Sequence, residues 1–130
     1  LVTLLMIYGM NRMVRIEQLA EAALTGDALT LRSLTQDWLA ENRRIADCHP
    51  PLSSDPTILS VAAGLAELFA DRRLELPPHW AAKIEPVHPP LYLVKAAKTM
   101  PRLRRLCETE SPSALKRRNL LAPPTFLEFA

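Results

Sequence analysis

The placement of proline limits most strongly what this chain can fold into. All twelve prolines lie between Pro50 and Pro124, so the first 49 residues contain none. Because proline removes a backbone donor and breaks a helix interior, long helices are favoured before Pro50. The chain after residue 76 is divided by prolines into short segments. Between these parts, residues 57–76 contain no proline and leave room for one more long helix.

The first of three long helices is predicted from Met13 to Thr25. Ile16, Leu19, Ala20 and Ala23 recur at the spacing of one helix face, and charged residues fill the opposite side. A helix with one apolar stripe buries that stripe against a neighbour, so this segment is expected to belong to the core.

A tight corner is predicted to follow. Gly26 suits the left-handed residue that ends a helix, and Asp27 suits the N-cap of a second helix from Ala28 to Asn42. The two helices are therefore expected to be antiparallel neighbours. The buried side of the second helix is predicted to comprise Leu31, Leu34 and Trp38, with Leu39 and Ala28 beside them.

The third long helix is predicted from Pro56 to Arg73. Asp55 can cap it, and proline is well tolerated at the first helical position. This is the most apolar segment of the chain, so it is expected to be the central, most enclosed helix. Gly64 in its middle costs about 1 kcal/mol relative to alanine, and we attribute its presence to the close approach of a neighbouring element.

Proline pairs followed by an aromatic residue mark the rest of the chain. The three cases are Pro77-Pro78-His79-Trp80, Pro89-Pro90-Leu91-Tyr92 and Pro123-Pro124-Thr125-Phe126. A rigid entry followed by an aromatic anchor is suited to pinning a segment onto a core formed elsewhere. The alternative is that these stretches are ligands for a proline-recognising domain.

Short helices are predicted between these proline pairs. Residues 91–98 are predicted as a short helix, with a strand at 91–94 as the alternative, and residues 101–109 as another helix. Ser111-Pro112 is expected to cap a third, from Ser113 to Asn119. The tail from 120 to 130 is apolar, and we expect it to dock on this domain or on a partner.

These segments predict an all-α fold. Three longer amphipathic helices form a core at 13–75, and short proline-punctuated helices at 76–130 wrap it, so that 13–130 is one helical domain. Residues 1–12 are treated as an N-terminal extension of uncertain status. They are apolar but too short for a membrane span, and they lack the basic start of a secretory signal.

No signature of an enzyme or of a cofactor site is found in the sequence. The two cysteines, Cys48 and Cys107, are too few for a disulfide framework, and we expect them to be reduced in a cytoplasmic protein. Cysteines and histidines lack the local spacing of a zinc site. The chain carries no glycine-rich phosphate loop and no nucleophile elbow. We therefore expect no metal and no cofactor, and no catalytic residue is assigned.

Charge is distributed unevenly along the chain. Residues 1–90 carry eight Lys or Arg against eleven Asp or Glu, whereas residues 91–130 carry eight against three. A basic last third favours acidic protein surfaces or phosphates, although a solvated helix face is an equally plain explanation. The candidate partner-binding residues are the basic clusters and the apolar tail: Arg102, Arg104, Arg105, Lys116, Arg117, Arg118, Phe126, Leu127 and Phe129.

The last fifty or so residues also resemble a known family. The resemblance is carried by Pro77-Pro78-His79-Trp80, Leu91-Tyr92-Leu93, Leu103-Arg104-Arg105-Leu106-Cys107-Glu108, the stretch from Glu110 to Asn119 (ESPSALKRRN) and Ala122-Pro123-Pro124-Thr125-Phe126-Leu127. It is similar to a family of small uncharacterised bacterial proteins associated with toxin–antitoxin-type gene pairs, in which the neighbouring gene resembles a nucleotidyltransferase. The resemblance implies a helical accessory or antitoxin-like role and supplies no site residues.

The sequence as a whole therefore predicts a non-enzymatic protein-interaction module. Its partner is expected to be another protein, of toxin-like character if the resemblance holds, and no membrane association is expected. The alternative is a nucleic-acid-binding protein that neutralises phosphates with the same basic clusters.

Overall fold

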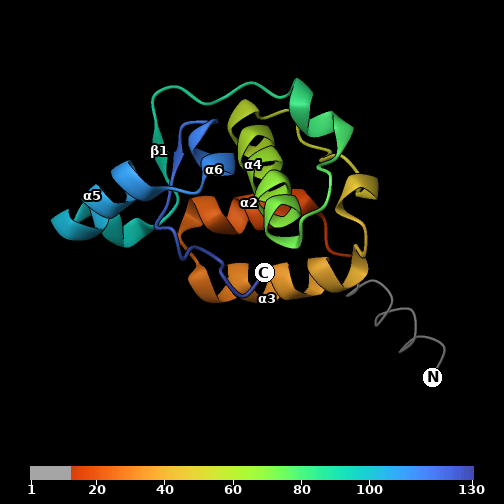
Figure 1. Cartoon of the computed structure of the whole chain (residues 1–130), viewed down its shortest axis with the longest axis horizontal. Helices are drawn as coiled ribbons and strands as arrows, with labels where there is room; N and C mark the ends of the chain where they lie inside the picture. Colours follow the sequence, from red (N-terminus) through yellow and green to blue (C-terminus); the bar gives the residue numbers. More distant parts are fainter. Residues whose placement is uncertain (1–12) are drawn as a thin grey trace.

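Helix α4 (Pro56–Arg73) is the most enclosed element of the fold, with ten of its 18 residues buried. The computed structural model describes residues 13–130, and the expected extension at 1–12 lies outside the described residues. Within them, α4 packs against α2 (Ile16–Thr25) on one side and against α6 (Ser113–Lys116) and the 3-10 helix η2 (His79–Lys83) elsewhere (Figure 1). The predicted cap is confirmed, since the Asp55 side chain accepts from the Thr57 N–H.

The corner between α2 and α3 (Ala28–Glu41) forms as predicted. Gly26 has a left-handed backbone (φ 76°) and ends α2, and the Asp27 carboxylate accepts from the Thr30 N–H at 3.0 Å. Helix α2 begins at Ile16 rather than at Met13. The buried face of α3 is also shifted from the prediction: Ala28 is exposed, Leu34 is half-buried and Thr35 is buried. Ala28 is the first residue of α3, and it lines an open pocket rather than a closed core.

Gly64 is in close contact with the C-terminal part of the chain. A Cβ built on Gly64 would lie 2.8 Å from Cδ1 of Leu120 and 3.2 Å from Cδ2 of Leu115. The predicted close approach is confirmed. The approaching groups are leucine side chains of α6 and of the strand that follows it.

Two short parallel strands join distant parts of the chain. β1 (Leu91–Tyr92) pairs with β2 (Leu120–Leu121), and the 3-10 helix η3 (Lys95–Lys98) follows β1. The helix predicted over 91–98 is therefore wrong for its first half, where the alternative of a strand holds for Leu91 and Tyr92, whereas residues 95–98 are helical. The physical reason is non-local, because the Leu91 N–H donates to the carbonyl of Asn119 and the Leu93 N–H to that of Leu121.

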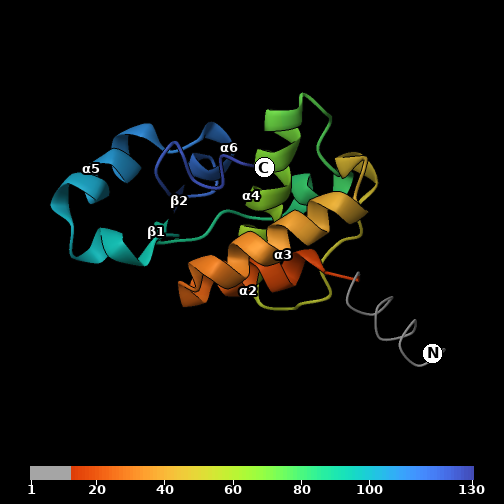
Figure 2. The same ribbon diagram turned by 90° about the horizontal axis from the view of Figure 1, so that it is seen from below.

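Helix α5 (Pro101–Glu110) and η3 lie to one side of α2, α3 and α4 in both views (Figures 1 and 2). We call the segment 95–110 the side lobe. Helix α6 ends at Lys116, earlier than predicted, and Ser111 does not cap it. Instead, the Ser111 hydroxyl accepts from the Ala122 N–H at 2.9 Å and contacts the carbonyl of Cys107, so it ties α5 to β2.

The described chain is mainly helical, as predicted. A third 3-10 helix, η1 (Ile45–Asp47), follows α3. Two of the predicted aromatic anchors hold connecting segments on the core: Trp80 donates from Nε1 to the carbonyl of Cys48, and Phe126 is buried. Among residues 13–130 no helix combines the length and apolar character needed to cross a membrane.

Candidate functional site

A largely apolar groove lies between the α2–α3 corner, the β1–η3 segment, the side lobe and the C-terminal tail. Its volume is about 390 Å³. We call it the apolar groove. Its walls are mostly aliphatic and include Ala23, Ala28, Leu31, Val94, Ala96, Leu103 and Phe126. Because segments far apart in sequence form these walls, the groove exists only in the folded chain.

The polar groups at the apolar groove are few. Of the described residues, only Asp27 and Lys95 line it with charged side chains. The Asp27 carboxylate is already engaged by Thr30, whose hydroxyl donates to it at 2.6 Å. Hydrogen bonds from the Thr30 side chain and backbone hold the pKa of Asp27 below its usual value. A ligand would therefore meet apolar walls, the Lys95 ammonium, and a carboxylate that stays ionised and is already hydrogen-bonded to Thr30.

Basic side chains continue from Lys95 along the side lobe. Residues 95–107 contain five Lys or Arg and no Asp or Glu. Lys95, Lys98, Arg102 and Arg105 are exposed, and none of them forms an ion pair with a described residue. This stretch is an uncompensated positive surface beside the apolar groove, which attracts negative charge.

Arg104 has a different role from its neighbours. Its Nε donates to the carbonyl of Ala97 at 3.1 Å, and its Nη2 donates to that of Lys98. Arg104 therefore joins α5 to η3 and stabilises the side lobe from within.

Arg118 corrects the sequence prediction. It was expected to point outward with Lys116 and Arg117, but it is only 6% exposed. Its Nε lies 2.6 Å from Oε1 of Glu67, and its other nitrogens donate to the carbonyls of Ile84 and Ala81. A buried, paired arginine cannot contact a partner, so Arg118 is removed from the candidate contact residues. The inward turn after α6 could not be seen in a run of three basic residues.

Lys116 and Arg117 remain exposed. Neither lines the apolar groove. The structure therefore does not bring the two predicted basic clusters together at this groove. Lys95 is the basic residue that lines it, and Arg102 and Arg104 lie next in sequence to Leu103 of its wall.

The three tail residues have three different environments. Phe126 is 8% exposed and lines the apolar groove, which places it within this domain rather than on a free surface. Leu127 is half-buried, and its carbonyl accepts from Arg72. Phe129 is 39% exposed, with the Arg32 guanidinium carbon 4.7 Å from its ring centroid. Only Phe129 keeps the exposure expected of a contact residue.

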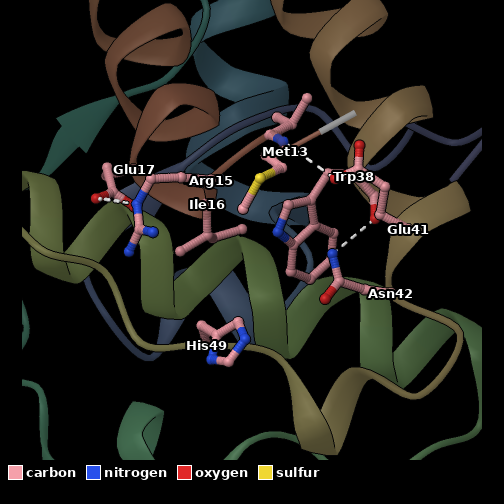
Figure 3. Close-up of a pocket in the computed structure, with 9 residues that line it drawn as sticks. Met13, Arg15, Ile16, Glu17, Trp38, Glu41, Asn42 and His49 are labelled. Carbon is pink, nitrogen blue, oxygen red and sulfur yellow. Dashed lines mark hydrogen bonds and ion pairs between the residues drawn. The ribbon is translucent and has the colours of Figure 1, made fainter. Parts of the chain in front are cut away.

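A second pocket of about 270 Å³ lies where α2 begins (Figure 3). Its polar lining side chains largely bond within the protein. Oε2 of Glu17 accepts from Nε of Arg15 and from the Leu52 N–H, both at 2.9 Å, and Asn42 donates to the carbonyl of Trp38. His49 faces this pocket from the loop after η1. Because its polar groups mostly stabilise the fold, the pocket is a weaker candidate than the apolar groove.

The described residues support neither a metal site nor a nucleophilic thiol. No group of three potential metal ligands occurs among residues 13–130. Both cysteines are free and buried. Burial raises the pKa of the Cys48 thiol to about 11, so Cys48 is protonated near neutral pH and a poor nucleophile.

The sequence prediction missed most of the groove. Leu31 was predicted to lie on a buried helix face, and Lys95 was not among the candidate partner-binding residues. Inward-facing periodicity does not distinguish a groove wall from a closed core, because both bury apolar side chains. Only the tertiary arrangement leaves this wall open.

No family model, curated protein or solved structure matches the chain.

Proposed function

We propose that this chain is a non-enzymatic protein-interaction module that binds an apolar segment with acidic side chains, supplied by a partner protein, in the apolar groove. The observation that carries the proposal is the pairing of an aliphatic groove with a positive border. Apolar walls favour burial of apolar side chains. Lys95 in the groove wall would pair with a carboxylate of the partner, and the exposed Lys98, Arg102 and Arg105 of the side lobe would attract further negative charge.

The geometry suits a short segment better than a broad, flat surface. A groove of about 390 Å³ has room for a few apolar side chains, as in complexes in which a helix or strand lies in a groove. Acidic side chains at the border would steer the encounter and add specificity rather than most of the affinity.

An antitoxin-like role is the specific form of this proposal that the family resemblance suggests. Binding of this kind would neutralise the partner by occupying one of its apolar segments. Genomic neighbourhood and co-purification with the neighbouring gene's product would test that form directly.

The proposal is tested with a displayed library of random peptides selected on the native chain. We expect enriched peptides to combine apolar anchors with Asp or Glu. Ala28→Trp fills the groove from an exposed position of its wall and should weaken binding of these peptides about tenfold or more, equivalent to ~1.4 kcal/mol. Ala40→Trp is the matched control, because Ala40 is also an exposed alanine of α3 but does not line the groove. Failure to enrich any peptide, or equal binding to both variants, would overturn the proposal.

Nucleic-acid binding is the rival proposal. It is supported by Arg102, Arg105, Lys116 and Arg117, which are exposed and form no ion pair with a described residue. Titration of short RNA and duplex DNA over a range of salt concentrations tests it, since phosphate contacts make affinity fall steeply with salt. No binding at low salt would remove this rival.

A further inference from the structure

Lys95 separates the apolar groove from a second hollow on its other side. This side pocket, of about 360 Å³, is lined by the end of α2, by Leu91 and Tyr92, and by Lys98. Ala23, Gly26 and Lys95 line both cavities. The two cavities are therefore neighbours, and Lys95 lies at their shared boundary.

The aliphatic stem of Lys95 lies flat on Gly26. A Cβ built on Gly26 would be 3.2 Å from both Cβ and Cδ of Lys95. Gly26 is thus constrained twice, by its left-handed backbone as the C-cap of α2 and by the lysine stem above it. The Lys95 ammonium has no ion-pair partner among the described residues, so no salt bridge holds the side chain in this position.

We propose that Lys95 is the specificity residue of the apolar groove, selecting a partner segment that carries a carboxylate between two apolar side chains. This inference rests on the proposed function. One apolar side chain enters the apolar groove and the other enters the side pocket. The carboxylate between them pairs with Lys95 and draws its stem off Gly26, which joins the two cavities into one.

A desolvated ion pair gives this selection its strength. Lys95 loses water when apolar groups cover it, and an unpaired charge there is costly. A partner without a carboxylate at this position is therefore rejected, and one with a lysine is rejected more strongly.

The charge of residue 95 is tested by repeating the peptide selection on Lys95→Glu. We expect the native chain to enrich peptides with Asp or Glu flanked on both sides by apolar residues, and Lys95→Glu to enrich Lys or Arg at that position. Lys116→Glu is the matched control, because it reverses an exposed lysine away from both cavities. Its selected peptides should keep the carboxylate.

The stem of Lys95 is tested with two further substitutions. Lys95→Met keeps an aliphatic stem over Gly26 without the charge, and should weaken a selected acidic peptide roughly tenfold, the effect of losing one desolvated charge pair. Lys95→Ala removes the stem as well. It should bind the Glu→Gln form of that peptide more tightly than the native chain does, because the cavities are then joined without a carboxylate.

The outcomes separate this inference from the proposed function. If the enriched peptides are acidic and sensitive to Ala28→Trp, but Lys95→Glu selects the same sequences, the role of Lys95 is overturned while the proposed function stands. If no selected peptide is sensitive to Ala28→Trp, the proposed function itself fails.

Discussion

Arg117 and Arg118 are adjacent arginines with opposite roles. Arg117 is exposed, whereas the side chains of Arg118 and Glu67 are only 7% and 13% exposed and lie 2.6 Å apart. Burying two charges is costly unless they are paired and hydrogen-bonded. Arg118 also donates hydrogen bonds to the carbonyls of Ala81 and Ile84. This one side chain therefore joins the end of α6 to α4 and to η2.

Arg118→Ala is expected to lower the free energy of unfolding by about 3–5 kcal/mol, because it leaves the Glu67 carboxylate buried without its partner. Urea denaturation measures the change. The control is Arg117→Ala, for which we expect a change within about 0.5 kcal/mol, as for an ordinary surface position. Arg118→Lys, which keeps the charge but not the fork of donors, should fall between the two. Equal effects at 117 and 118 would contradict this assignment.

The Glu17 carboxyl makes the stability of the fold depend on pH. Its burial raises the pKa of the carboxyl, but hydrogen bonds from Arg15 and the Leu52 N–H outweigh burial and hold the pKa below its usual value of 4.5. A group with a lowered folded pKa stabilises the protein above its unfolded pKa, and this contribution is lost as pH falls through the folded value.

Glu17→Gln therefore tests whether the charge of Glu17 stabilises the fold. We expect the native chain to be more stable than this variant at neutral pH, and the difference to shrink as pH falls below 4.5. Unfolding in urea at a series of pH values measures it. A difference that does not change with pH would show that the charge of Glu17 is not what stabilises the fold.

At the scale of elements, the helix ends were easier to predict than the short strands, which depend on distant segments. The α2–α3 corner and the start of α4 depend on local chemistry, a glycine terminator and aspartate caps, so the sequence predicted them closely. β1 depends on hydrogen bonds to Asn119 and Leu121, about thirty residues away. Local periodicity contains no information on such a partner, which is why a helix was predicted there.

Gly64 connects α4 to β2 and offers a test of that packing. Alanine gains about 1 kcal/mol of helix propensity, but overpacking a core costs about 1–3 kcal/mol. Because the added Cβ would lie 2.8 Å from the fully buried Leu120, we expect overpacking to exceed propensity and Gly64→Ala to be destabilising. Thermal or urea unfolding measures whether the substitution raises or lowers the free energy of unfolding.

The same change in a Leu120→Val background is the decisive control. Valine lacks the δ carbon that the new Cβ meets, so Gly64→Ala should become neutral or stabilising there. Identical effects in both backgrounds would mean that the contact with Leu120 is not the reason for the glycine.

Ser111 is the link between the side lobe and β2. Ser111→Ala removes the acceptor that the described residues 13–130 provide for the N–H of Ala122, a residue that is fully buried. An orphaned buried donor costs about 1–3 kcal/mol, and we expect this loss in urea unfolding, together with faster hydrogen exchange at the Ala122 amide. Ser113→Ala, at an exposed serine nearby, should change neither quantity.

At the scale of the whole molecule, the apolar groove forms only when segments far apart in sequence pack together. Its walls come from α2, α3, the β1–η3 segment, α5 and the tail. The sequence predicted a helical core and a basic C-terminal third, but it assigned a contact to Arg118, which the fold buries, and it did not predict that Phe126 lines a groove. Residue type sets which side chains are apolar or charged, whereas tertiary packing decides which apolar wall stays open.

The most direct test of the groove as the binding site is an NMR footprint of a selected acidic peptide on the native chain. We expect the backbone amide chemical shifts to change at residues 22–31, 93–96 and 123–126, which contain most of the groove's lining residues. Changes confined to residues 13–17 and 38–49, around the second pocket, or to the basic residues 116 and 117, would contradict it.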